Sequence, residues 1–209
     1  MTRAVGLAVL VMSLVLFGVA AADAATDVQK FAVKGQNASA FFSSVDGTGC
    51  IVTYAGVFAG DQVTQSKPQP SATASSVWVF LDIIDNCTWT YLASASGSTE
   101  LAPEQFVVDK KLSSADLAAA VELYNYVTNA SFIVDVDLHW TATGATTQTG
   151  SRSFYRSPGF SVKSNFKGAF APASATGTIL DGSTNYAANP SDYADLADTQ
   201  SGDMVKTKY

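Results

Sequence analysis

One stretch of the chain decides the fold: Phe132-Ile133-Val134-Asp135-Val136-Asp137-Leu138-His139-Trp140. Its large apolar side chains alternate with ionisable ones, which places Phe132, Val134, Val136, Leu138 and Trp140 on one face. Successive side chains of a β-strand point to opposite faces, so this alternation predicts a strand with one buried face. A register shift of one residue would bury the two carboxylates and the imidazole, and the register is therefore strongly specified.

The same period of two recurs on both sides of this stretch. Residues 160–170 alternate in the same way, and residues 77–84 are apolar on both faces, which indicates a central strand. A polar surface loop is expected at 66–75, where Pro68 and Pro70 lie. Short turn sequences separate the strands, namely Asp46-Gly47-Thr48-Gly49, Ser157-Pro158-Gly159 and Asp181-Gly182. The sequence therefore predicts an all-β fold, an antiparallel β-sandwich or barrel.

One segment, residues 113–127, fits two structures. Ser113-x-x-Asp116 is a weak capping box, and the apolar residues that follow have helical spacing, so one short helix around 114–126 is possible. The same residues also alternate as a strand, with Leu117, Val121 and Leu123 on one face. The short polar turn 128–131 leads directly into the strand quoted above, and this favours the strand.

The N-terminus has the three parts of a secretory signal peptide. Arg3 supplies the positive charge, Val5 to Val19 is an uncharged apolar run, and Ala22-Asp23-Ala24 is a cleavage site of the A-x-A type. Ala20-x-Ala22 is a second such site, and an uncleaved anchor is the competing interpretation. We expect a signal peptide at 1–24, a secreted or periplasmic product, and no membrane span after cleavage.

The composition limits the partners of the remaining chain. Charged residues make up 14% of the sequence and its net charge is −6, which disfavours binding to nucleic acid. The length suits one β-domain at 25–186. Residues 187–209 are polar and acidic and are expected to form an extended C-terminal tail, with Met204-Val205 able to add a last short strand.

The two cysteines, Cys50 and Cys87, allow only one pairing. Their spacing matches neither a metal knuckle nor a C-x-x-C redox motif. Because an oxidising compartment favours disulfides, we expect a structural Cys50–Cys87 bridge.

Asp135, Asp137 and His139 are the sharpest candidates for a metal site. A strand places all three on one face, and two carboxylates with an imidazole are suitable ligands for a divalent cation. The alternative is that they form only the wet face of a half-buried strand. No ligand from a second strand is evident in the sequence.

Four cations gather within a short segment: Arg152, Arg156, Lys163 and Lys167. If Pro158-Gly159 closes a two-residue hairpin, Phe154 lies opposite Lys163 and Arg152 lies opposite Asn165, so that all four cations share one face. Such a face could bind an acidic glycan or another anionic partner. The alternatives are that the cations pair with Asp135 and Asp137, or only keep the sheet soluble.

The sequence contains no known catalytic motif that would support an enzyme. The single histidine has no G-x-S-x-G elbow beside it, and no P-loop, G-x-G-x-x-G or H-E-x-x-H motif occurs. Trp78, Trp89 and Trp140 could form a platform for sugar rings, although the register of Trp140 assigns it to the core. Three glycosylation sequons begin at Asn37, Asn86 and Asn129 and matter only in a eukaryotic host.

Three functional hypotheses remain. The first is an exported, non-enzymatic β-domain that binds a glycan or an extracytoplasmic protein and needs no cofactor. The second is a metal-assisted hydrolase that uses Asp135, Asp137 and His139. The third is a structural or protective secreted protein. An exposed row of aromatic side chains on the sheet would favour sugar binding among these.

Overall fold

The computed structural model describes residues 28–67, 72–187 and 190–208. The predicted signal peptide at 1–24 lies outside these ranges. Within them the chain forms strands and turns and no helix, which confirms the all-β prediction. No helix there has the length and hydropathy needed to cross a membrane.

All the strands pair antiparallel with their neighbours. Their bounds are β1 Val28–Val45, β2 Ile51–Lys67, β3 Ala72–Asp85, β4 Thr90–Glu100, β5 Phe106–Val108, β6 Ser114–Asn125, β7 Ala130–Ala142, β8 Thr147–Ser157, β9 Phe160–Asp181, β10 Thr184–Asn185 and β11 Tyr193–Lys208. The segment that could have been a short helix is β6, and every second side chain from Ala115 to Asn125 is buried. Alternation with period two therefore prevails over the capping box, because β6 pairs along its whole length with β7.

The ladders close into a ring, so the fold is barrel-like. From β1 the hydrogen-bonded neighbours run through β2, β3, β4, β6, β7, β9 and β11 and return to β1. Closure depends on the long strand β9, which pairs with β11 through residues 160–173 and with β7 through residues 173–180. The narrowest contact in the ring is between β4 and β6, where only Ala95 and Ser96 are in register with the neighbouring strand.

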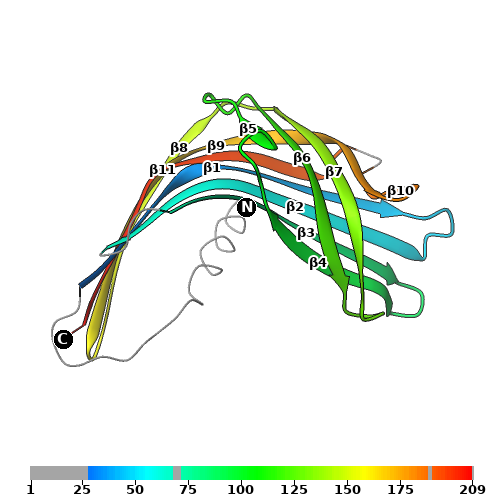
Figure 1. The fold of residues 1–209 in the computed structure, drawn as a ribbon, viewed down its shortest axis with the longest axis horizontal. Helices are drawn as coiled ribbons and strands as arrows, with labels where there is room; N and C mark the ends of the chain where they lie inside the picture. Colours follow the sequence, from blue (N-terminus) through cyan, green and yellow to red (C-terminus); the bar gives the residue numbers. More distant parts are fainter. Residues whose placement is uncertain (1–27, 68–71, 188–189, 209) are drawn as a thin grey trace, which may run out of the picture.

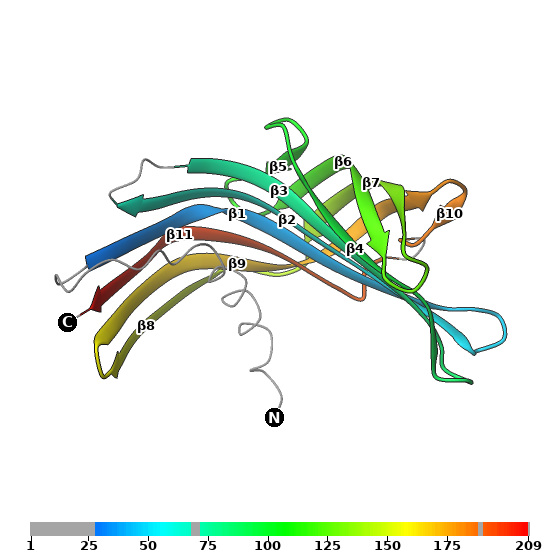
Figure 2. The same ribbon diagram turned by 60° about the horizontal axis from the view of Figure 1, so that its bottom comes forward.

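Beyond the ring, the long strands continue into an open sheet, which we call the extension. It consists of β8 together with residues 160–168 of β9, 199–208 of β11, 28–36 of β1 and 60–67 of β2. Figure 1 shows these strand ends side by side, reaching away from the ring to the lower left. In both views β6 and β7 lie at the opposite end of the long strands (Figure 2).

The core fills the inside of the ring. The decisive strand is β7, whose Val134, Val136, Leu138 and Trp140 are buried while Asp135, Asp137 and His139 are exposed, as the alternation predicts. Burial of an aliphatic side chain of this size contributes about 1.5–3 kcal/mol. The Trp140 indole N–H donates a hydrogen bond of 2.7 Å to the carbonyl oxygen of Ser39, which satisfies the one polar atom of this core side chain.

The predicted C-terminal tail is wrong for residues 193–208. They form β11, which lies between β1 and β9 in the ring and in the extension. Few large apolar residues mark this strand, because its buried inner positions are filled by Ala194 and Leu196 and its outer half lies in the open extension. The loop expected at 66–75 is also shorter than predicted, since β2 continues to Lys67 and β3 begins at Ala72.

Candidate functional site

The three predicted metal ligands lie in a line along the outside of β7. Asp135, Asp137 and His139 pair with Leu180, Thr178 and Thr176 of β9 and are exposed. Side chains two residues apart on one strand face are about 6.5–7 Å apart, so the three do not converge on one point.

His139 makes its close contact with a residue that sequence analysis did not select. Its Nδ1 lies 2.6 Å from Oδ1 of Asp116, the residue directly opposite it on β6. The His139 and Asp116 side chains are 51% and 68% exposed, so the pair lies in water at the barrel surface. A cross-strand pair of this kind contributes modestly to sheet stability. Such a pair is expected if these residues form only the solvent-exposed face of a half-buried strand.

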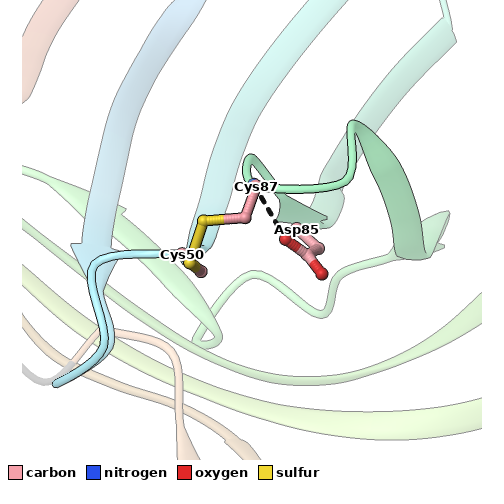
Figure 3. Close-up of side chains that lie close together, drawn as sticks. All are labelled: Cys50, Asp85 and Cys87. Carbon is pink, nitrogen blue, oxygen red and sulfur yellow. Dashed lines mark hydrogen bonds between the residues drawn. A yellow bond between two sulfur atoms is a disulfide. The ribbon is translucent and has the colours of Figure 1, made fainter.

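Among the described residues, one group of three potential metal ligands lies within 4.8 Å: Cys50, Asp85 and Cys87. The two sulfur atoms form the predicted disulfide, which joins the β1–β2 turn to the β3–β4 turn (Figure 3). Oδ1 of Asp85 accepts a hydrogen bond of 2.8 Å from the Cys87 backbone N–H, and hydrogen bonding led by Thr88 lowers the pKa of Asp85. The group is therefore a cross-linked turn rather than a thiolate metal site.

The β8–β9 hairpin has the register that the sequence predicts. Phe154 lies opposite Lys163 and Arg152 lies opposite Asn165, with the Arg152 Nε donating to Asn165 Oδ1 over 3.4 Å. Arg152, Arg156, Lys163 and Lys167 are exposed and share the face that continues into the barrel interior. They do not approach Asp135 and Asp137, which lie on the outer face beside residues 178–180 at the far end of β9.

The structure reveals an aromatic row that the sequence analysis did not identify. Five rings lie in contact on the outer face of β1, β2 and β3, with centroid distances of 5.8 Å for Tyr54–Phe41, 6.1 Å for Phe41–Phe80, 5.3 Å for Phe80–Trp78 and 5.4 Å for Trp78–Phe58. Trp78 is 42% and Phe58 37% exposed. We call these five side chains the aromatic row.

Register explains how residues far apart in sequence form this row. Phe58 and Trp78 are direct cross-strand partners, and Gly56 lies opposite both Phe41 and Phe80. A Cβ atom at Gly56 would overlap the Phe80 ring, so the absent side chain makes room for Phe80 to lie over β2. The signal in the sequence was the apolar outer face of residues 77–84, but its partners on β1 and β2 depend on strand pairing.

Polar groups border the aromatic row on the β11 side. The Tyr193 hydroxyl donates to Asp195 Oδ2 over 2.7 Å, and the Ser39 hydroxyl donates to Asp195 Oδ1 over 2.8 Å. Tyr193 lies opposite Phe41 and Ser39 opposite Phe58. Partial burial, together with the hydrogen bond to Asp195, raises the pKa of Tyr193 to about 12, so its hydroxyl is neutral at physiological pH. The row thus combines two exposed rings, Trp78 and Phe58, and three half-buried ones with hydrogen-bonding groups at its edge.

Comparison of the chain with models of known protein families, with curated proteins and with solved structures finds no match. The function must therefore be inferred from the chain's own surfaces. Two of them have distinct chemistry: the aromatic row on the outside of the barrel and the cationic face of the extension.

Proposed function

We propose that this protein is an exported, non-catalytic carbohydrate-binding domain and that the aromatic row binds the sugar rings. The aromatic row itself is the observation that carries the proposal. Monomeric soluble proteins seldom have a contiguous apolar patch on their surface unless that patch binds a ligand or a partner. Export is supported by the predicted signal peptide and by a disulfide suited to an oxidising compartment.

The chemistry of a sugar ring matches this surface. A pyranose ring has faces of polarised C–H groups, which stack favourably on the electron-rich faces of aromatic rings. Its hydroxyls need hydrogen-bonding partners, and the Asp195 carboxylate and the Ser39 and Tyr193 hydroxyls lie along the edge of the row. Because the rings extend over three strands, they suit a chain of several sugars better than a single one.

A neutral polysaccharide is the ligand that best fits the row. The row contains no cationic residue, and the one charged group that borders it on β11 is the carboxylate of Asp195. An acidic sugar chain would be repelled there, whereas neutral hydroxyls can donate to the carboxylate. The scaffold supplies a rigid base, because the buried faces of the same strands belong to the core.

The test is affinity electrophoresis and calorimetry with neutral polysaccharides and hexasaccharides built from glucose, xylose or N-acetylglucosamine. Replacing Trp78 and Phe58 with Ala should weaken binding at least tenfold, since each stacked ring contributes about 1 kcal/mol. Trp89→Ala/Tyr91→Ala is the matched control, because these two rings are 84% and 53% exposed but lie outside the row. Failure of every neutral sugar to bind would refute the proposal and favour a structural or protective role. Equal sugar binding by the row variant and the control would refute the assignment of the sugar site to the aromatic row.

A further inference from the structure

The cationic face of the extension is larger than the β8–β9 hairpin alone. Lys163 lies opposite Val205 of β11, and Val205 lies opposite Lys30 of β1, so both lysines project from the same face. Lys34 follows Lys30 by four residues on β1 and shares that face. We call this surface the basic face; it is formed by Lys30, Lys34, Arg152, Arg156, Lys163 and Lys167, all exposed.

This face concentrates the positive charge of an acidic protein. It holds six of the 12 Lys and Arg residues, although the chain carries 18 Asp and Glu residues and a net charge of −6. Asp203 on β11 is the acidic residue between the lysines of β1 and those of β9, and Asp61 and Asp198 lie on the same side at the junction with the barrel. Cations therefore exceed acids two to one on a protein where acids predominate.

Most of these cations are available to a partner. In the described ranges, Lys30, Lys34, Arg152, Lys163 and Lys167 form no ion pair with a carboxylate within 4.0 Å, whereas Arg156 already has an interaction within the protein. Arg152 makes one hydrogen bond, to the neutral Asn165. Exposed like charges on one face repel one another, and this arrangement costs stability unless an anion is bound.

The cations lie on either side of β11, in one column on β1 and in two neighbouring columns on β9 and β8. Lys30 and Lys163 are separated by two strand spacings, about 10 Å, and Lys163 and Lys167 by four residues along β9, about 13 Å. Small or neutral side chains, Val205 and Thr207, occupy the strip between the columns of β1 and β9 together with Asp203. On β8, the Phe154 ring is 60% exposed between Arg152 and Arg156.

We propose that the basic face binds an acidic polysaccharide, at a site separate from the aromatic row. An acidic polysaccharide suits this face better than a nucleic acid, because a nucleic acid carries one phosphate every 3.4 Å along each strand and the net charge of −6 on the chain opposes so dense a negative charge. The exposed Phe154 ring offers a stacking surface for a sugar between two guanidinium groups. Binding is electrostatic and weakens as salt increases.

The experiment is a binding titration of the full protein with sodium polygalacturonate, with neutral dextran as the reference polymer. The quadruple variant Lys30→Gln/Lys34→Gln/Lys163→Gln/Lys167→Gln should lose at least tenfold in affinity. The double variant Lys163→Gln/Lys167→Gln should also lose affinity, whereas its charge-matched control Lys110→Gln/Lys111→Gln changes two exposed lysines at the β5–β6 turn and should bind as the wild type does. Thermal melting checks that all three variants fold.

The outcomes separate this site from the aromatic row. Trp78→Ala should leave polygalacturonate binding unchanged, so either site can fail without the other. The proposal is overturned if polygalacturonate does not bind at low salt, or if the quadruple and control variants bind equally. Tighter binding to duplex DNA or to vesicles of phosphatidylserine than to polygalacturonate would also overturn it and would identify the other class of anion.

Discussion

Trp89 and Asn129 hold the same left-handed backbone conformation at the same position of two different hairpin turns, with φ of 56° and 55°. Four residues earlier, the side chains of Asp85 and Asn125 each accept hydrogen bonds from the backbone N–H groups two and three residues later. Asparagine tolerates this conformation, whereas tryptophan does so at a cost. The Trp89 side chain is 84% exposed, so packing does not repay that cost.

Trp89→Asn should therefore stabilise the protein by about 1 kcal/mol, because asparagine relieves the backbone strain and little packing is lost. Urea denaturation of the two proteins measures the difference. Asn129→Ala is the converse change and should destabilise by a similar amount. A loss of stability in Trp89→Asn would mean that the indole makes contacts that matter for folding.

The register of β7 can be tested by substitutions on its two faces. Val136 is 2% exposed, so Val136→Asp places a carboxylate in the core and should lower the free energy of unfolding by about 3 kcal/mol or more. Asp137→Ala changes an exposed side chain and should alter the free energy of unfolding by less than about 0.5 kcal/mol. Equal effects of the two changes would contradict the strand register, and loss of a bound metal in Asp137→Ala would support the hydrolase hypothesis.

The disulfide should stabilise the folded barrel without being required for it. Cys50 and Cys87 are 37 residues apart, and closing a loop of that length contributes about 3–4 kcal/mol in the chain-entropy model. The double variant Cys50→Ala/Cys87→Ala should melt at a lower temperature but keep its β-sheet circular dichroism, since the core lies within the barrel. Complete unfolding of this variant at 25 °C would show that the core alone is insufficient.

Acid should destabilise the turns through three carboxylates. Hydrogen bonds led by those from Thr48, Thr88 and Ser113 lower the pKa values of Asp46, Asp85 and Asp109 from 3.8. A lowered folded-state pKa gives stability that is present above pH 3.8 and lost as the pH falls through the folded-state value. The triple variant with Asn at these positions keeps the side-chain acceptors and should lose less melting temperature between pH 5 and pH 2.5 than the wild type does.

Much of the fold could be predicted from local alternation. The pairing of strands that are far apart in the sequence could not be predicted in this way. The strand at 132–140, the hairpin at Pro158-Gly159 and the Cys50–Cys87 bridge follow from spacing within short segments. The strand β11 was missed because its alanine and polar residues give weak alternation. Its position next to β1 depends on pairing with residues more than a hundred positions earlier in the chain. Ring closure through β9 has no local sequence signal either.

The candidate sites show the same division. The shared face of Arg152 and Lys163 was predictable from one hairpin, whereas Lys30 joins them only through β11. The aromatic row was missed because Phe41, Phe58 and Trp78 come from three different strands. The row also depends on Gly56, whose missing side chain makes room for the Phe80 ring. His139 was selected as a metal ligand, but its partner Asp116 is defined by the β6–β7 register.

Sugar binding at the aromatic row is tested most directly by the fluorescence of Trp78. In the Trp89→Asn variant two tryptophans remain, and Trp140 is fully buried, so acrylamide quenching reports mainly on Trp78. A neutral hexasaccharide that binds by stacking on the row should at least halve the quenching constant at saturation. Quenching that stays unchanged while calorimetry shows the sugar to be bound would contradict the assignment of the aromatic row as the binding site.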